Sequence, residues 1–194
     1  MKMTDFYQKH YKAYHEKTFS IDPSSFLEPL VKKLPGEAFI LDVGCGSGRD
    51  LLWMKKQGFE AIGFERSPSL AQLARENTGC EVIDGDFEAH DFSLFLVDAI
   101  ILVGALVHVP YKGFSKVFEN ITAAISKHGI VLITLKEGDE VRTDPDGRTF
   151  YLWQDPKIRS VFDTLGFAVC DVSKSVSKTG SKDVWMSYVL DKTG

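Results

Sequence analysis

Short apolar runs alternate along the chain with longer stretches in which apolar residues recur every three or four positions. The short runs predict β-strands, and runs that are apolar on both faces are typical of a buried parallel sheet. They cover residues 39–43, 59–64, 80–83, 97–103, 130–135, 167–172 and 184–190. Only a loop joins the last two runs, so we expect these two strands to pair antiparallel.

The stretches with helical spacing lie before and between the strands. Ser67-Pro68 is a clear helix start, because serine suits the N-cap and proline suits the first turn. Segment 85–96 leaves little room for a crossover helix, so we expect a turn or a short helix there. Helices are predicted at residues 23–34, 49–57, 67–74, 114–125 and 155–165, the fourth of them closed by Gly129.

The regular alternation of strand and helix predicts an α/β fold with a doubly wound, three-layer sheet. No repeat, low-complexity run or linker divides the 194 residues, which suffice for one domain with a full core. We therefore expect a single domain over residues 1–194. Residues 1–36 would form an N-terminal helical lid or cap, and residues 37–194 the core.

Composition narrows the possible environments and partners. The formal net charge is −4, so no basic face and no broad nucleic-acid affinity are expected. Residues 1–7 lack an apolar signal core, and the longest apolar stretch, 94–111, is too interrupted to span a membrane. We expect a cytoplasmic protein without a metal site, whose three widely spaced cysteines are buried thiols: Cys45, Cys80 and Cys170.

The most informative segment is the strand and glycine-rich loop FILDVGCGSGRD at residues 39–50. Gly44, Gly46 and Gly48 remove side chains where the chain turns, so a ligand can press against bare backbone. The helix that follows offers free N–H groups to an anionic group. This arrangement predicts a nucleoside-bearing cofactor at the edge of a parallel sheet.

Three acids near the loop refine this prediction. Glu65 ends the second strand, where a carboxylate can accept hydrogen bonds from two ribose hydroxyls. Asp42 precedes the loop, where it would repel a pyrophosphate and suits a cofactor with a cationic amino group. Asp86 follows the third strand. Each acid could instead have a local role, as a cap, a helix-terminal charge or a turn residue.

These motifs resemble the class I S-adenosylmethionine-dependent methyltransferases, most of all the small bacterial-type members of the tellurite-resistance-like branch. The resemblance spans residues 5–191 and rests on LDVGCGSGRD, GFERS, GDF, LVHVP, GRTF and the tryptophan of the final strand. It implies a Rossmann-like sheet with strand order 3-2-1-4-5-7-6 and strand 7 antiparallel. It also implies S-adenosylmethionine as cofactor and S-adenosylhomocysteine as product.

The resemblance assigns cofactor contacts residue by residue. Asp42 and the loop backbone would hold the methionine end, and Glu65 would bind the ribose. Asp86 would contact the adenine amino group, the Phe87 backbone the adenine ring, and Val103 would floor the pocket. The full set expected at the cofactor is Asp42, Gly44, Cys45, Gly46, Gly48, Glu65, Arg66, Asp86, Phe87, Val103 and Tyr14.

The acceptor side has weaker signals. His108 is the best candidate for a general base by position, although a histidine there could simply pack. Tyr11 and Tyr14 share a helical face with Tyr7, which suits a lid or a plain packing helix. Tyr151 and Arg148 are candidate substrate residues, although Arg148 could instead pair with Asp144 or Asp146. Trp185 is expected in the core.

The predicted function is methyl transfer from S-adenosylmethionine to a small molecule, with proximity as the main catalytic effect. Two alternatives share the same strand, loop and ribose acid: a nicotinamide-dependent oxidoreductase, and a non-catalytic module that binds S-adenosylmethionine. The sequence fixes neither the acceptor atom nor the oligomeric state.

Overall fold

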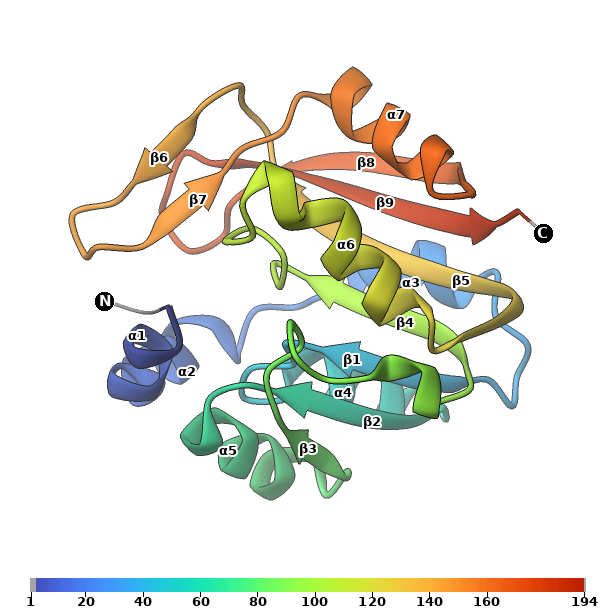
Figure 1. Cartoon of the computed structure of the whole chain (residues 1–194). Helices are drawn as coiled ribbons and strands as arrows, with labels where there is room; N and C mark the ends of the chain where they lie inside the picture. The colour runs from blue at the N-terminus through green and yellow to red at the C-terminus, as the bar shows by residue number, and fades with distance from the viewer. Residues whose placement is uncertain (1–2, 194) are drawn as a thin grey trace.

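The computed structural model describes residues 3–193 (Figure 1). Residues 1, 2 and 194 of the expected 1–194 domain lie outside the described residues, as does the start of the segment expected to lack a signal core. The strands are β1 Phe39–Val43, β2 Glu60–Glu65, β3 Val82–Asp84, β4 Val97–Val103, β5 Ile125–Lys136, β6 Val141–Thr143, β7 Thr149–Tyr151, β8 Phe167–Val176 and β9 Val184–Lys192.

Seven strands form the main sheet in the order β3-β2-β1-β4-β5-β9-β8, and β6 and β7 form a separate ribbon. Strands β1 to β5 pair in parallel, whereas β9 runs antiparallel to both β5 and β8. Counted within the main sheet, β8 and β9 are the sixth and seventh strands. The predicted order, 3-2-1-4-5-7-6 with strand 7 antiparallel, is therefore confirmed.

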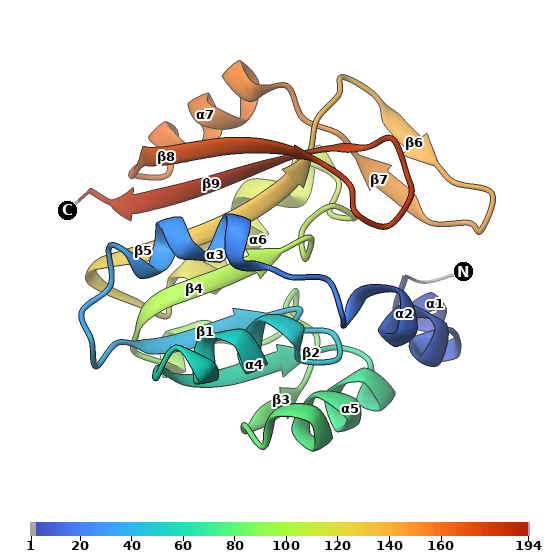
Figure 2. The same ribbon diagram turned by 180° about the vertical axis from the view of Figure 1, so that it is seen from behind.

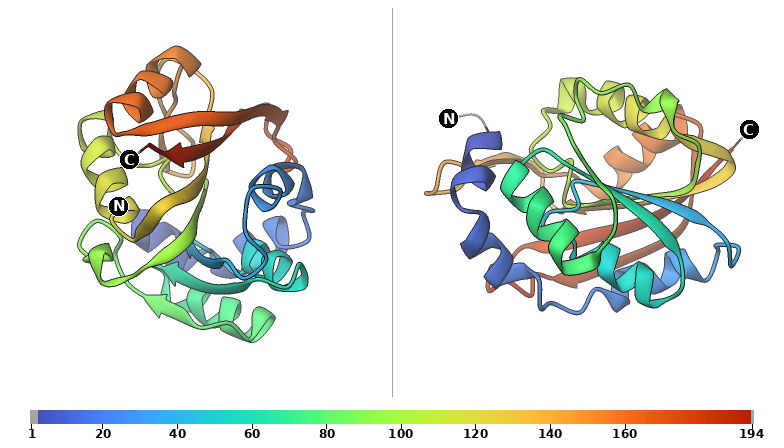
Figure 3. Two further views of the ribbon diagram at one scale, coloured as in Figure 1. Left: turned by 90° about the vertical axis from the view of Figure 1, so that its right-hand side faces the viewer. Right: turned by 90° about the horizontal axis from the view of Figure 1, so that it is seen from below.

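Helices cover both faces of this sheet and complete the three layers (Figures 2 and 3). One face carries α3, which packs on β5 and β9, together with α4 and α5, which pack on β2 and β3. The other face carries α6, α7 and η1, which bury the larger aromatic part of the core. The bounds are α1 Met3–Lys9, α2 Tyr11–Thr18, α3 Ser24–Val31, α4 Arg49–Lys56, α5 Pro68–Thr78, the 3-10 turn η1 Phe92–Leu94, α6 Tyr111–Thr122 and α7 Asp155–Thr164.

The first two helices and the β6–β7 ribbon lie beyond the carboxyl ends of the parallel strands (Figure 1). The tyrosine-bearing segment is helical as expected, but it breaks at His10 into α1 and α2. Both helices contact α5. In open α/β sheets this end is where ligands bind, so the N-terminal helices stand over the expected site.

Three expectations need correction. Ile125 is the first residue of β5, where it pairs with Val97, so α6 ends at Thr122 and Gly129 lies inside a strand. The apolar spacing misleads here because Ile125 continues the spacing of α6 and is buried like the apolar residues of that helix. The cysteines are free, but only Cys45 is buried. Cys170 is exposed because it sits at the irregularity between Val169 and Asp171 on edge strand β8.

No helix within residues 3–193 is long and apolar enough to cross a membrane.

Candidate functional site

The glycine loop after β1 is held against the next strand by its own backbone. The N–H groups of Gly44 and Cys45 donate to the Phe64 carbonyl of β2, at 2.7 and 3.2 Å. Gly46 has φ +57°, a conformation that side chains disfavour, and an added Cβ would lie 3.2 Å from Cε1 of Tyr14. Glycine is therefore needed where the loop meets helix α2.

Glu65, at the end of β2, joins this loop to the start of α5. Its Oε2 accepts from the Gly46 N–H and its Oε1 accepts from the Ser67 N–H, both at 2.8 Å. The residue is only 7% exposed, and burial raises the pKa of its carboxyl despite these bonds. Each carboxylate oxygen can accept more than one hydrogen bond, so the fixed carboxylate can still receive ligand hydroxyls.

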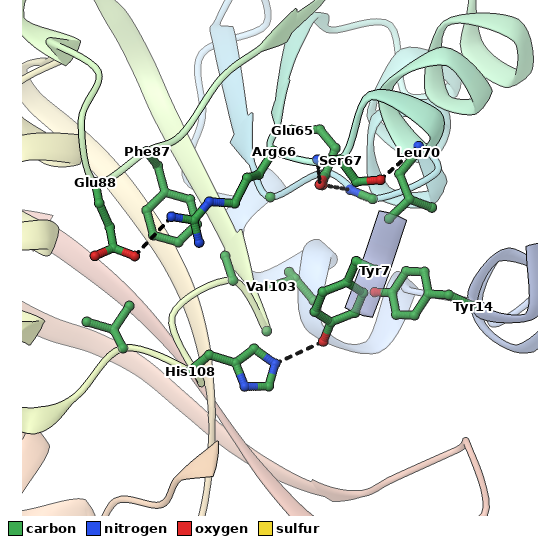
Figure 4. Close-up of a pocket in the computed structure, with 15 residues that line it drawn as sticks. Tyr7, Tyr14, Glu65, Arg66, Ser67, Leu70, Phe87, Glu88, Val103 and His108 are labelled. Carbon is green, nitrogen blue, oxygen red and sulfur yellow. Dashed lines mark hydrogen bonds and ion pairs between the residues drawn. The ribbon is translucent and has the colours of Figure 1, made fainter. Parts of the chain in front are cut away.

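These groups face a cavity of about 120 Å³ at the carboxyl end of the sheet (Figure 4). Eight of the residues expected from sequence line it together: Tyr14, Gly44, Gly46, Glu65, Arg66, Phe87, Val103 and His108. The remaining lining residues come from α1, the start of α5 and the segments after β3 and β4: Tyr7, Ser67, Leu70, Glu88, Gly104, Ala105 and Val109.

Several expected residues do not reach this cavity. Asp42 is 2% exposed, and its Oδ2 has no hydrogen-bond partner among the described residues. Burial and the nearby Asp50 raise the pKa of Asp42 well above its usual range. Gly48 supports packing instead, because an added Cβ would lie 2.7 Å from the Thr78 side chain on α5. Cys45 is buried, with an added Cβ on Gly63 only 2.8 Å from its Sγ.

Asp86 acts on the cavity through a neighbour. Its carboxylate pairs with Arg66, whose guanidinium also lies 3.2 Å from Glu88. The same guanidinium sits over the Phe87 ring, 5.5 Å from its centroid. Asp86 thus fixes Arg66 against the aromatic wall, although its own side chain is not part of the cavity lining.

On the opposite side, Tyr7 and His108 bridge helix α1 and the segment after β4 (Figure 4). His108 Nδ1 faces the Thr149 carbonyl, which can only accept, so Nδ1 carries the proton. Nε2 therefore accepts from the Tyr7 hydroxyl, at 2.9 Å. Burial lowers the pKa of His108 to about 4. Both ring nitrogens are engaged, and His108 is neutral near pH 7.

A second cavity, of about 330 Å³, adjoins the first. Tyr7, Tyr14, Val103 and Gly104 line both. Arg148 lies in the second cavity and also pairs with Asp146 at 2.7 Å, so both of the roles considered for it fit its position.

In the second cavity, buried Lys136 pairs with Asp183 at 2.8 Å. Trp185 was expected in the core, but it is only half-buried and lines this cavity. Tyr11 and Tyr151 line neither cavity, and the Tyr151 ring packs edge-on against Tyr111. No group of three or more potential metal ligands from histidine, cysteine, aspartate and glutamate occurs within residues 3–193.

Residues 40–129 match the family model described as a methyltransferase domain. This match covers 90 of the 194 residues. The matched span contains the glycine loop, Glu65, Phe87 and His108, and hence most of the first cavity. Together with the fold, the match supports a class I S-adenosylmethionine-dependent methyltransferase, as the motifs indicated.

Among curated proteins, the chain resembles bud23, an 18S rRNA (guanine-N(7))-methyltransferase of Schizosaccharomyces pombe. The identity is 28% over 109 residues, which are 48% of this chain and 40% of that protein. The similar region thus spans less than half of either protein.

Among solved structures, a Burkholderia thailandensis 1,6-didemethyltoxoflavin-N1-methyltransferase with bound S-adenosylhomocysteine has a TM-score of 0.78 at 17% identity, over 99% of this chain and 88% of that one. A TehB-like S-adenosylmethionine-dependent methyltransferase from Corynebacterium glutamicum has a TM-score of 0.70 at 20% identity, over 98% of each chain. At these identities the likeness establishes a shared fold. The S-adenosylhomocysteine in the first structure agrees with the expected cofactor.

Proposed function

We propose that this protein transfers the methyl group of S-adenosylmethionine to a small-molecule acceptor. The observation that carries the proposal is the position of Glu65, fixed between the glycine loop and α5 at a cavity that adjoins a larger one. A cofactor in the first cavity and an acceptor in the second would meet at Val103 and Gly104, which line both.

The residues present fit the cofactor. Side chains are excluded at Gly44 and Gly46, since an added Cβ on Gly44 would lie 2.8 Å from the Ala105 Cβ. In the proposed complex the loop backbone holds the methionine end, and Glu65 accepts from the ribose hydroxyls. Phe87 and Arg66 offer a flat wall to the adenine. When bound, the cofactor supplies an electrophilic methyl group on a positively charged sulfur.

The protein's main catalytic contribution would be to hold the acceptor in line with that methyl group, an effect that reaches roughly 7–11 kcal/mol in well-oriented systems. His108 would act as a base only through Tyr7, because both of its ring nitrogens are engaged. Tyr7 would take the acceptor's proton as its own proton passes to Nε2. With a pKa of about 4, His108 is a weak base and suits acceptors that need little deprotonation.

The N-terminal helices would serve as a lid. Tyr7 on α1 and Tyr14 on α2 line both cavities, so these two helices cover the site. We infer that α1 and α2 shift when the cofactor enters and then exclude water from the reacting atoms. The rest of the expected lid, residues 1–36, includes α3, which packs on the sheet with Leu27 and Leu30 fully buried and belongs to the core.

The likeness to bud23 favours a second candidate, transfer to an RNA base. The net charge of −4 argues against it, because neutralising phosphates requires a basic surface. A small acceptor that the second cavity can enclose is therefore the better supported substrate.

A labelling experiment tests the proposal. The protein is incubated with S-adenosylmethionine carrying a ¹³C methyl group and, in separate reactions, with a small-metabolite extract and with total RNA. We expect label in a small molecule, and none when Glu65→Ala replaces the native protein. Label in RNA alone would establish the second candidate, and tight S-adenosylhomocysteine binding with no labelled product would indicate a non-catalytic module.

A further inference from the structure

The second cavity is positively charged although the chain as a whole is negative. Its lining contains five cationic and two anionic side chains, whereas the chain carries a formal net charge of −4. The cations are Lys17, Arg49, Lys136, Arg148 and Lys178, and the anions are Asp144 and Asp183. A cleft lined by charges of one sign concentrates the electrostatic field and attracts ligands of the opposite sign.

Two of these cations are left for a ligand. Arg49, Lys136 and Arg148 each lie within 2.8 Å of a carboxylate. Within the described part of the chain, the exposed Lys17 and Lys178 make no ion pair. Lys178 donates to the Asp22 carbonyl at 3.1 Å, and its charge helps to lower the pKa of the Asp22 carboxyl. Because Lys17 is on α2 and Lys178 is in the β8–β9 loop, positive charge faces the cavity from two separate segments.

The inner end of the same cavity has a flat wall. Trp185 leans over Gly104, and an added Cβ on Gly104 would lie 3.3 Å from Cη2 of the indole. Since Gly104 lines both cavities, the indole stands at their junction. The Phe150 ring is less available for stacking, because Lys136 Nζ lies 3.5 Å from its centroid and the Arg148 guanidinium lies 5.3 Å from it. The same Lys136 Nζ is more distant from the Trp185 ring, at 5.5 Å from its centroid. Trp185 is thus the surface on which a planar group can lie.

The junction also lacks a strong base. Tyr7 and Tyr14 line both cavities, and burial raises the pKa of both hydroxyls. His108 lines the first cavity but not the second, and its Nε2 is engaged by the Tyr7 hydroxyl. An acceptor whose nucleophilic atom is already ionised, or whose charge is spread over a conjugated ring, needs no stronger base.

We propose that the second cavity takes a planar, conjugated acceptor bearing an anionic group, an inference that rests on the proposed function. The anion lies toward Lys17 and Lys178, and the ring lies against Trp185 with its methyl-accepting atom at Gly104. This class excludes cationic amines, which the lysines repel, and small inorganic oxyanions, which have no planar group to lie on the indole.

The test uses the full chain saturated with S-adenosylhomocysteine and three probes of one shape: 2-naphthoate, its neutral amide and the cationic 2-naphthylmethylamine. Dissociation constants come from ligand-observed NMR. We expect 2-naphthoate to bind roughly tenfold more tightly than the amide, and the amine to bind least. Tellurite and selenite should not displace 2-naphthoate.

Paired variants locate the effect. Lys17→Gln/Lys178→Gln should remove most of the preference for 2-naphthoate while binding of the amide is kept. The matched control, Lys12→Gln/Lys182→Gln, removes exposed lysines from the same helix and the same loop that do not line the cavity, and should change nothing. Trp185→Leu should weaken 2-naphthoate and the amide alike.

The outcomes separate the two proposals. If S-adenosylhomocysteine does not bind, the proposed function fails and this inference fails with it. If it binds but 2-naphthoate does not bind, or binds no better than the amide, only the anionic acceptor is contradicted. Equal loss of 2-naphthoate affinity in both lysine pairs would also contradict it.

Discussion

Replacing Glu65 with glutamine changes one atom at the point where the loop, α5 and the expected ribose meet. Both oxygens of Glu65 accept backbone N–H groups at 2.8 Å, from Gly46 and Ser67. The glutamine amide must point its NH₂ group at one of these donors. That backbone N–H then loses its partner in a site where the side chain is only 7% exposed.

The expected magnitude follows from these contacts. A buried N–H without a partner costs about 1–3 kcal/mol of folding free energy, and a lost hydrogen bond to a charged acceptor costs about 1.5–3 kcal/mol. Glu65→Gln removes at least one such bond to a ribose hydroxyl. At about 1.4 kcal/mol per tenfold, the Kd for S-adenosylhomocysteine should rise about 10- to 150-fold.

Isothermal titration measures this effect, and Glu60→Gln is the matched control because it alters an exposed glutamate on the same strand. A 2′-deoxy analogue of S-adenosylhomocysteine provides the second comparison. It should bind the native protein more weakly than the parent compound, and Glu65→Gln should narrow that difference. A folded Glu65→Gln variant whose affinity stays within about twofold of native would refute the ribose role.

Three further predictions concern the loop, the histidine and the lid. Gly46→Ala places a side chain at φ +57° and against Tyr14, so it should lower the free energy of unfolding by about 1–2 kcal/mol and lower the Tm in calorimetry. The control, Gly36→Ala, has open space around the added Cβ and should leave the Tm unchanged. Equal Tm values for the two variants would contradict the argument. Because burial lowers the pKa of His108 from 6.5 to about 4, the unfolded chain takes up this proton first as the pH falls. The stability that neutral His108 gives the folded protein is therefore fully present above pH 6.5 and is lost as the pH falls toward 4. Between pH 7 and 5, urea unfolding should show the native protein losing about 2 kcal/mol more stability than His108→Gln. Equal losses in the two proteins would exclude this effect. If the lid closes on the cofactor, S-adenosylhomocysteine at about 100 times its Kd should slow tryptic cleavage at Lys12 roughly 100-fold, and an unchanged rate would argue against the lid.

The parts of the molecule that sequence predicts well are local. Strand β1, the glycine loop and α4 follow one another within 18 residues, and each has its own signal in apolar runs, glycine spacing and helix start. The alternation predicts the doubly wound α/β class, whereas the strand order is implied only by the family resemblance. Glu65 could be placed because it ends a strand that must lie beside β1 in a parallel sheet.

The parts that sequence misses are made by contacts between distant segments. Tyr7 and His108 are 101 positions apart, and neither residue has a neighbour that signals their hydrogen bond. The second cavity draws its lining from α2, β5, the β6–β7 ribbon and the β8–β9 loop, whose lysines and serines look like ordinary surface residues in the sequence. Trp185 was expected in the core because it belongs to an apolar strand. In the structure its side chain lines the second cavity.

A crystal structure of the protein with S-adenosylhomocysteine tests the central claim most directly. We expect the ribose hydroxyls within hydrogen-bond distance of Glu65, the amino-acid end along Gly44 to Gly46, and the sulfur facing the junction at Val103 and Gly104. A ligand bound elsewhere, or one whose ribose turns away from Glu65, would contradict this account.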